Sequence, residues 1–193
     1  MPLDAYTDAT DDALMVLFAN GDRLAAQELT SRLAPRVLAQ AYRVLGDRAE
    51  AEDVSQEAML RLWRQAADWR QGEAKVSTWL YQVAGNLCTD RLRKRRPQAP
   101  EDAAAELADT ALGAEARMQQ GARARALHGA LQELPDRQRQ AVVLRHLEEL
   151  PNPEIAHIMG VGVEAVESLI SRGKRQLVGL LGKRKQDLGV LDD

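Results

Sequence analysis

Residues 151–177, PNPEIAHIMGVGVEAVESLISRGKRQL, have the pattern of a helix, a tight turn and a second helix. Asn152 is a residue type that caps helices, because its side-chain oxygen accepts an otherwise unpaired backbone N–H. Pro153 then falls at the first helical position, where its missing N–H costs no hydrogen bond. Gly160 follows where a left-handed residue commonly ends a helix. We expect a second helix from about Val163.

The second helix of this pair is predicted to be amphipathic. Its apolar residues, spaced as on one side of a helix, are Val163, Val166, Ile170 and Leu177. The opposite face carries Glu164, Glu167, Ser168, Ser171, Arg172 and Arg175. A short helix that anchors a second helix with a polar, partly basic outer face is typical of a helix-turn-helix, which presents side chains to the DNA major groove. The alternative is an ordinary helical hairpin whose polar face is only solvated.

Helical patterns also account for the rest of the chain, and no strand-like alternation or internal repeat is visible. We expect helices over residues 12–19, 23–45, 48–66, 77–95 and 117–134, and a further helix that starts at Pro135. A bend is expected near Pro35. The aromatic share of 4% and the abundance of Ala, Leu, Arg, Gln and Glu favour helix over sheet. The predicted fold class is therefore all-α.

The composition changes between two helical blocks. Residues 97–116 contain two prolines, five acidic residues and no Lys or Arg, which predicts a flexible acidic linker. The chain is thus expected to form two small helical domains, the second a four-helix domain with the helix-turn-helix. The predicted boundaries are a disordered N-terminus over 1–11, a first domain over 12–96, the linker over 97–116, a second domain over 117–182 and a tail over 183–193.

Charge and composition narrow the classes of function. The formal net charge of −3 argues against a uniformly basic nucleic-acid binder, but phosphate contacts need only a local positive potential. Cys88 is the one cysteine, which suits a reducing cytoplasm, and we expect it to fill a helix face. His128, His146 and His157 lie apart, without the spacing of metal ligands. No apolar run reaches the length of a membrane span. We predict a cytoplasmic protein without metal, cofactor or membrane insertion.

Two segments of the first block carry unusual faces. Asp53, Gln56, Glu57 and Leu60 fall together on a helix, and this mixed face suits either a protein partner or a solvated helix side. The segment 75–96 ends with the basic residues Arg91, Arg93, Lys94, Arg95 and Arg96. A cationic last turn can complement the helix dipole. Five basic residues in six positions exceed that need, which favours phosphate binding.

The chain resembles a bacterial RNA polymerase sigma factor in three successive segments: AEAEDVSQEAMLRLW, VSTWLYQVAGNLCTDRLRKRR and LQELPDRQRQAVVLRHLEELPNPEIAHIMGVGVEAVESLISRGKRQL. Its short, two-domain form is similar to the extracytoplasmic-function (ECF) group. The resemblance implies sigma region 2 over 12–96 and sigma region 4 over 117–182. It also implies a protein that binds core RNA polymerase and directs promoter recognition and transcription initiation in a stress, envelope or environmental response.

The resemblance assigns roles to residues of the first domain. The face Asp53, Gln56, Glu57 and Leu60 would dock on the clamp helices of the polymerase β′ subunit. The residues that would capture the −10 promoter element are Lys75, Ser77, Trp79, Tyr81, Gln82, Asn86, Arg91, Arg93, Lys94, Arg95 and Arg96. A pocket that stacks or hydrogen-bonds a flipped base lowers the cost of unstacking it. Helical phase, however, favours a core position for Trp79.

The resemblance assigns the −35 promoter element to the last helix. Its readers would be Glu164, Glu167, Ser168, Ser171, Arg172, Lys174 and Arg175. Arg172 can pair with guanine and Glu167 can accept from cytosine, whereas Lys174 and Arg175 favour phosphates. Two glycines depart from the expected pattern. Gly162 stands where the family commonly has a Ser or Thr cap. Gly173 lies within the expected helix and lowers its propensity by about 1 kcal/mol against Ala. The implied partners also include the polymerase β flap and a cognate anti-sigma factor.

Three other functions compete with this interpretation. A helix-turn-helix transcriptional regulator would share the segment LPDRQRQAVVLRHLEELPNPEIAHIMG but would leave the first block without a role. An adaptor that mimics a sigma factor and sequesters an anti-sigma factor would not need the basic run 91–96. An enzyme is disfavoured, because no nucleophile–base–acid set, phosphate loop or metal spacing is present in the sequence. We therefore expect no catalytic residues.

Overall fold

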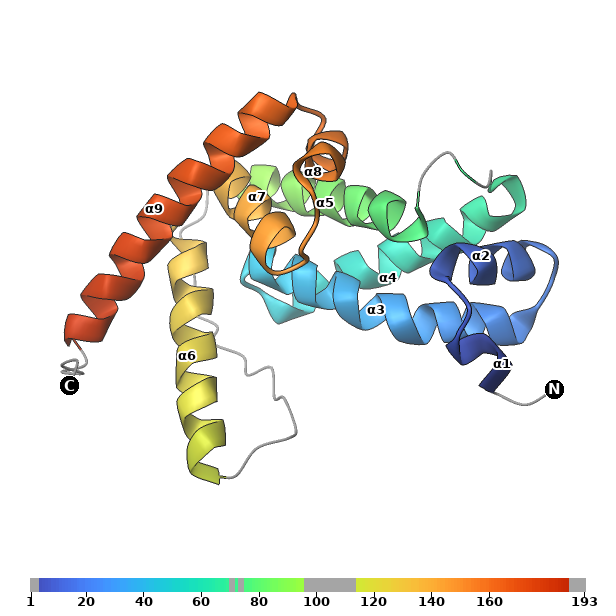
Figure 1. The fold of residues 1–193 in the computed structure, drawn as a ribbon, viewed down its shortest axis with the longest axis horizontal. Coiled ribbons are helices and arrows are strands. Elements are labelled where there is room, and N and C mark those ends of the chain that lie inside the picture. The colour runs from blue at the N-terminus through green and yellow to red at the C-terminus, as the bar shows by residue number, and fades with distance from the viewer. Residues whose placement is uncertain (1–3, 70–71, 73–74, 96–113, 188–193) are drawn as a thin grey trace.

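The computed structural model describes residues 4–69, 72, 75–95 and 114–187, and within these ranges the chain is helical without any strand, as the predicted all-α fold requires. Figure 1 shows the arrangement. The first domain contains α1 (Asp4–Thr7), α2 (Asp11–Ala19), α3 (Arg23–Leu45), α4 (Arg48–Gln65), the 3₁₀ turn η1 (Ala66–Asp68) and α5 (Val76–Arg95). The second contains α6 (Ala114–Gln132), α7 (Asp136–His146), α8 (Asn152–Met159) and α9 (Val163–Asp187). Arg96 and most of the predicted linker lie outside the described residues, as does the end of the predicted tail.

Helix α3 is bounded by a capping residue at its start and a glycine at its end, both of types that commonly bound helices. The Asp22 carboxylate accepts hydrogen bonds from the backbone N–H groups of Leu24 and Ala25, which caps the start of the helix. Gly46 ends it in a left-handed conformation, with φ of 74°, and its N–H donates to the carbonyl of Tyr42. Asp47 then caps α4 by accepting from the N–H of Glu50. Pro35 lies inside α3, which continues through it.

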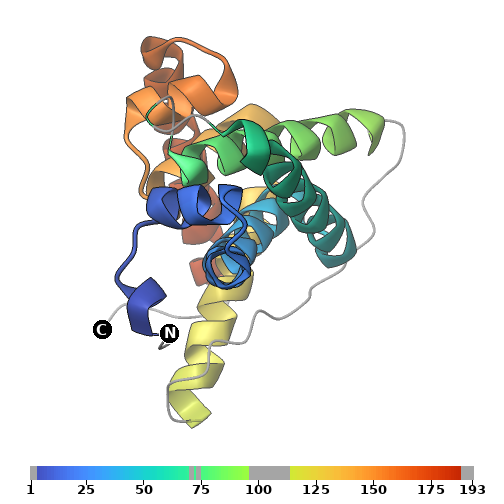
Figure 2. The ribbon, with the colours of Figure 1, turned by 90° about the vertical axis from the view of Figure 1, so that its right-hand side faces the viewer.

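Helix α3 forms the centre of the first domain. Figure 2 looks along α3, with α2, α4 and α5 around it, and all three pack against it. Its buried stripe includes Leu29, Leu33 and Val37. The same core continues into the second domain, because Leu131 of α6 and Val142 of α7 belong to this one cluster of buried residues. The two domains therefore share apolar packing in addition to the chain connection.

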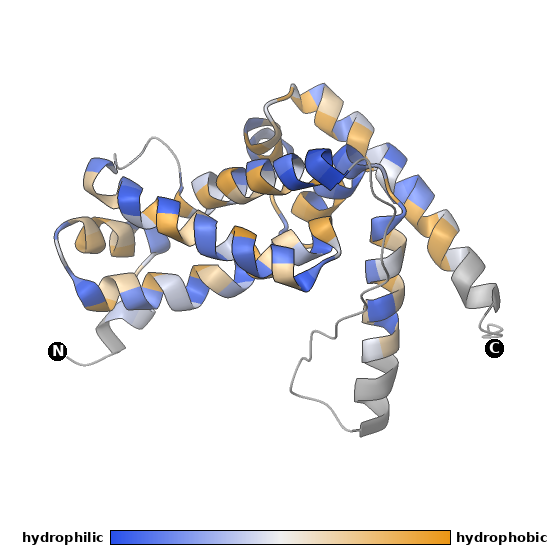
Figure 3. Cartoon of the chain, turned by 180° about the vertical axis from the view of Figure 1, so that it is seen from behind, coloured by the Kyte–Doolittle hydropathy of each residue, from blue (hydrophilic) through white to orange (hydrophobic). Residues whose placement is uncertain are grey.

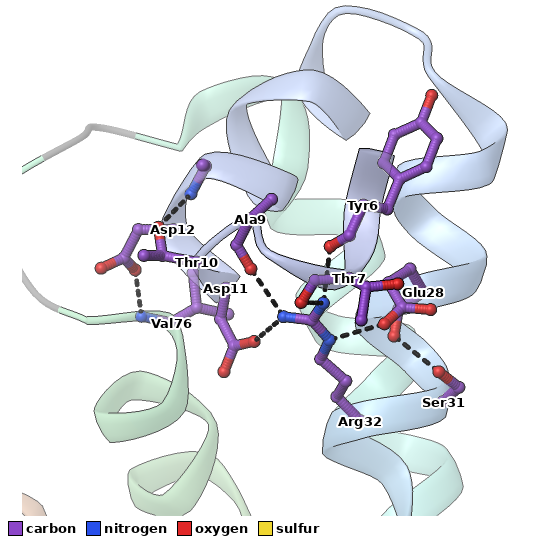
Figure 4. A network of polar contacts seen from close by, with 11 residues as sticks. Tyr6, Thr7, Ala9, Thr10, Asp11, Asp12, Glu28, Ser31, Arg32 and Val76 are labelled. Atoms are coloured by element: carbon purple, nitrogen blue, oxygen red, sulfur yellow. Dashed lines mark hydrogen bonds and ion pairs between the residues drawn. The ribbon is translucent and has the colours of Figure 1, made fainter. Parts of the chain in front are cut away.

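Disorder is expected over residues 1–11, but Asp4–Thr7 form α1 and residues between Tyr6 and Asp11 contact Arg32 of α3. The Arg32 guanidinium reaches back to this segment from α3 and organises it (Figure 4). It donates to the carbonyls of Tyr6, Thr7 and Ala9 at 2.6–2.9 Å and forms ion pairs with Asp11 and Glu28 at 3.5 and 2.7 Å. An arginine inside a helical pattern gives no sign that its partner is the chain's N-terminal segment.

The second domain packs against the first mainly through α8 on α5 and through α6 and α7 on α3 (Figure 1). Helix α6 begins at Ala114, slightly before the predicted start at 117. Figure 3 shows α5 apolar over its first part and hydrophilic toward its C-terminal end. The apolar part is where α5 meets its neighbours, whereas the hydrophilic part carries the basic run. Among the described helices none is long and apolar enough to span a membrane.

Candidate functional site

Helix α4 exposes the mixed face that sequence reasoning singled out. Val54, Ala58 and Leu62 are fully buried on one side of the helix. On the other side Asp53, Gln56 and Leu60 are exposed, and Glu57 is half-buried. The Arg61 guanidinium donates to the Glu57 carboxylate at 2.8 Å, and this hydrogen bond lowers the Glu57 pKa. The predicted face is thus present on the surface of the structure.

One further residue of this face was missed. Trp63 follows Leu60 by three positions, and its side chain is 43% exposed, as is that of Leu60. Residues three apart on a helix are neighbours, so Trp63 extends the apolar part of the face. Exposed tryptophans are enriched at the energetic centres of protein interfaces. The spacing alone could have placed Trp63 here, but a tryptophan on a helix is usually a core residue.

Helix α5 is positioned from its N-terminal end by α2. The Asp12 carboxylate accepts a hydrogen bond from the N–H of Val76 at 2.8 Å, which supplies a cap from another element (Figure 4). Trp79 packs against the core, as helical phase indicated, and its ring meets Trp69 edge to face with centroids 6.1 Å apart. In this structure Trp79 is a packing residue and not an open stacking platform.

Three of the residues expected to bind −10 DNA instead contact the second domain. Tyr81 is buried at 2% exposure, and its hydroxyl donates to Glu148 at 2.8 Å. The Lys75 ammonium forms a 2.8 Å ion pair with Glu154, which raises the Lys75 pKa and lowers that of Glu154. The Gln82 amide lies 3.5 Å from the carbonyl of His157. Burial and the carboxylate of Glu148 raise the Tyr81 pKa, so its phenol is protonated at neutral pH.

The remaining −10 candidates divide into surface and structural residues. Asn86, Arg93 and Lys94 are exposed, whereas Ser77 and Arg91 are half-buried. The Arg91 guanidinium lies 3.5 Å from Asp53, which links the basic run to the α4 face. Arg95 does not point outward as expected, because its guanidinium binds Glu50 at 2.8 Å and the Leu45 carbonyl at 2.8 Å. It thus completes the C-terminal end of α3.

The helix-turn-helix is formed by α8 and α9, with one detail that differs from the sequence prediction. The N–H of Ile155 donates to the carbonyl of Pro151, so α8 begins one residue earlier than expected. Asn152 therefore lies inside the first turn and does not cap it, and its side-chain oxygen is buried without a hydrogen bond in the described part of the chain. Gly160 ends α8 in a left-handed conformation, as predicted.

Helix α9 presents its predicted polar face to solvent. All seven −35 candidates are exposed: Glu164, Glu167, Ser168, Ser171, Arg172, Lys174 and Arg175. Val166 is fully buried on the inner side, in a cluster with Ile155 and Ile158 of α8. Gly173 is also buried, because α9 crosses α7 so closely that a Cβ there would lie 2.7 Å from Val142. The weak helix former is explained by this close approach.

The described residues hold no group of three or more His, Cys, Asp or Glu side chains placed to bind a metal ion. Cys88 is buried on α5, and burial raises its pKa to about 12, so the thiol is protonated at neutral pH and fills a helix face as predicted. The site is therefore a set of three surfaces: the α4 face, the α5 surface with its basic end, and the outer face of α9.

A helical body with a basic helix end, joined to a second body with a helix-turn-helix, is typical of DNA-binding proteins. Residues 29–98 match the family model for Sigma-70 region 2, and residues 124–177 match that for Sigma-70 region 4. The chain belongs to the ECF RNA polymerase sigma factors, which bind core RNA polymerase and promoter DNA to direct transcription initiation. The match over 29–98 accounts for the first block, which a simple regulator would leave without a role.

Relatives and solved structures agree with this assignment. The chain is 32% identical over 168 residues to the ECF sigma factor SigW of Bacillus subtilis, with 81% of this chain and 89% of the relative covered. It is 33% identical over 177 residues to the ECF sigma factor SigM of Mycobacterium tuberculosis, with 91% and 86% covered. The fold is similar to that of the sigma factor RpoE bound to the anti-sigma factor NepR from Bartonella quintana, with a TM-score of 0.68 and 21% identity over 81% of this chain and 96% of that one. It is also similar to CnrH bound to the cytosolic domain of CnrY, with a TM-score of 0.66 and 26% identity over 90% and 97%.

Proposed function

We propose that the three surfaces divide the work of a sigma factor. The α4 face, Asp53, Gln56, Glu57 and Leu60 together with Trp63, binds the clamp helices of the polymerase β′ subunit. Its exposed apolar pair within a charged rim has the composition of a protein interface. The α5 surface and its basic end bind the −10 element, and α9 reads the −35 element while region 4 contacts the β flap.

The observation that carries this proposal is the orientation of α9. Its inner side is fixed by the buried residues Val166 and Gly173, so its outer side is free to enter a groove. Arg172 and Glu167 then face bases, and Lys174 and Arg175 face phosphates. Arg95 is excluded from the DNA-binding set by its contacts with α3 and Glu50. Trp79 is retained only as support for the α5 surface, because it packs on Trp69.

Run-off transcription with purified core polymerase tests this division. With the wild-type chain as the sole sigma factor, core polymerase is expected to initiate transcription on genomic DNA. With the Arg172→Glu, Arg175→Glu double variant, transcripts from promoters that depend on a −35 element should be lost. Arg23→Glu with Arg123→Glu makes the same charge change at sites outside the three surfaces and should keep initiation. Activation only when another sigma factor is present would favour a regulator, and no initiation at all would favour an anti-sigma-binding adaptor.

We also propose a cognate anti-sigma factor as a regulatory partner, because RpoE and CnrH were solved in complex with NepR and with the cytosolic domain of CnrY. We propose that the chain works in the cytoplasm, where its polymerase partner is and where a single unpaired cysteine such as Cys88 stays reduced. The response that it serves, to stress, envelope damage or the environment, is proposed from the family alone. The chain has no catalysis of its own in this proposal, since the polymerase supplies the chemistry. Co-purification of the tagged chain from its host, with and without stress, tests the anti-sigma partner.

A further inference from the structure

The first turn of α5 carries two of the proposed −10 contacts but starts after a residue that cannot cap it. Lys75 is exposed and Ser77 is half-buried, and between them Val76 is fully buried. Lys75 precedes the helix, and its carbonyl accepts the first helical hydrogen bond, from the N–H of Trp79 at 3.0 Å. An ammonium group has no lone pair, so the Lys75 side chain cannot accept from the unpaired N–H groups of the first turn.

Asp12 of α2 supplies the missing acceptor. Its carboxylate accepts a hydrogen bond from the N–H of Val76 at 2.8 Å, across 64 positions of the sequence. The helix dipole also favours a negative charge at this end of α5. Helix ends readily fray. The hydrogen bond to Asp12 therefore holds the turn that carries Lys75 and Ser77.

Asp12 is itself fixed by the N-terminal part of the domain (Figure 4). Arg32 of α3 forms an ion pair with the neighbouring Asp11 at 3.5 Å and donates to three backbone carbonyls of the segment before α2. Leu14 and Met15, which follow on α2, are fully buried in the core. Helix α2 also packs against η1 and α5. Asp12 is therefore a fixed acceptor and not a mobile surface acid.

A fixed first turn matters for binding, because a strand that binds a frayed turn must order it first, and this ordering lowers the affinity. We propose that Asp12 is a positioning residue for −10 capture. Through the N–H of Val76 it holds the first turn of α5 in the shape in which Lys75 and Ser77 meet DNA. Asp12 acts through α5 and does not touch the DNA. This role rests on the proposed function of the α5 surface.

Two substitutions separate the hydrogen bond of Asp12 from its charge. Asp12→Ala removes the acceptor, whereas Asp12→Asn removes only the charge, because the amide oxygen can still accept. The separation is needed because the charge also reaches Lys75, whose pKa is raised chiefly by Glu154 and to a smaller extent by Asp12. The matched control is Asp8→Ala, which removes one carboxylate at an exposed position between α1 and α2. Circular dichroism of each variant checks that helix content is kept.

The first readout is binding of DNA by holoenzymes assembled from core polymerase and each chain. The probe is a single-stranded non-template oligonucleotide that spans the −10 region of a start site mapped by run-off transcription. Asp12→Ala should bind it about fivefold more weakly, the loss that corresponds to one missing helix cap. Asp12→Asn and Asp8→Ala should bind as the wild type does, and all chains should bind core polymerase equally. Wild-type binding of DNA by Asp12→Ala, or an equal loss in Asp12→Asn, would overturn the proposal.

The second readout is a double-mutant cycle, which distinguishes positioning from a general loss of stability. If Asp12 acts by placing Lys75 and Ser77, then Asp12→Ala should change the affinity for the oligonucleotide little once both carry the changes Lys75→Ala and Ser77→Ala. The same loss in both backgrounds would overturn the positioning role and leave the proposed function of α5 intact. Wild-type binding by the Lys75→Ala, Ser77→Ala chain would instead contradict the proposed function at these residues, and the role of Asp12 with it.

Discussion

Gly173 is buried where α9 crosses α7, which gives a prediction at the scale of one residue. A Cβ at this position would lie 2.7 Å from Val142 and 3.3 Å from the backbone oxygen of Gln138. Gly173→Ala should therefore lower the free energy of unfolding by about 1 kcal/mol, because overpacking outweighs the gain in helix propensity. A Cβ on Gly179 of the same helix would meet no neighbouring atom within 4 Å, so Gly179→Ala should raise stability by up to about 1 kcal/mol. Urea unfolding measures the free energy of unfolding of both variants. A Gly173→Ala variant that is more stable than the wild-type chain would contradict the close crossing of α9 and α7.

Arg95 and Lys94 are neighbours in the basic run, but their side chains have different surroundings in the structure. The Arg95 guanidinium binds Glu50 and the Leu45 carbonyl, whereas Lys94 is exposed. Arg95→Ala should cost about 1–2 kcal/mol of stability because it leaves charged hydrogen bonds unmade. Lys94→Ala should leave the melting temperature unchanged and lower the affinity of the holoenzyme for promoter DNA, more so at low salt. Equal effects of both variants on stability would contradict this division.

The proposed docking role of the α4 face can be tested by replacing Trp63 and, as a control, a residue of similar exposure outside the face. Trp63→Ala should weaken binding to core polymerase by at least about tenfold, the loss typical of a buried interface tryptophan. Leu24 at the start of α3 is equally exposed, at 43%, and lies outside the proposed surfaces, so Leu24→Ala should bind as the wild type does. Titration of labelled core polymerase measures both. Unchanged affinity of the Trp63→Ala variant would remove the tryptophan from the docking face.

At the scale of elements, α6 is held to α3 by a stacked pair that should respond to pH. The His128 and Tyr42 rings lie 4.4 Å apart and nearly parallel. Burial lowers the His128 pKa, so the folded chain favours the neutral imidazole. The stabilisation is complete above the unfolded pKa, about 6.5, and is lost as the pH falls through the lower folded value.

The variant His128→Phe keeps a ring but cannot take up a proton. The wild-type chain should therefore lose more unfolding free energy than His128→Phe when the buffer is changed from neutral to mildly acidic, below the unfolded pKa of about 6.5. Burial also lowers the pKa of His146, so both chains should lose some unfolding free energy through this second histidine. Urea unfolding in the two buffers measures this difference. The same loss in both chains would show that His128 does not carry the effect.

The helices themselves could be predicted well because their ends are local. The helix expected over 23–45 has the bounds of α3, which Asp22 caps and Gly46 ends in the structure, and the helix-turn-helix followed from Gly160 and the spacing around Val166. Asn152 failed as a cap because Pro151, which precedes it, already accepts the first helical hydrogen bond. Competition between adjacent residues for the same role cannot be resolved from residue type.

Long-range partners could not be predicted in this way. Glu148 and Glu154 look like ordinary solvated acids of a helical hairpin, and their contacts with Tyr81 and Lys75 join residues more than sixty positions apart. Arg32 and the N-terminal segment are a second example, as is Arg95 at the end of α3. The family resemblance implied a DNA contact for Tyr81, whereas the packing of the second domain buries this side chain in the structure.

At the scale of the whole molecule, polymerase and promoter DNA are proposed to bind two different surfaces: the exposed outer face of α4, and the surface of α5 that the second domain covers in this structure. Hydrogen exchange with and without core polymerase measures the protection of both surfaces in one experiment. We expect slower exchange over the outer face of α4, and faster exchange over the first turns of α5 and over α8, when polymerase is added. Unchanged or slower exchange in α5 and α8, with α4 protected, would contradict opening of the domains on polymerase.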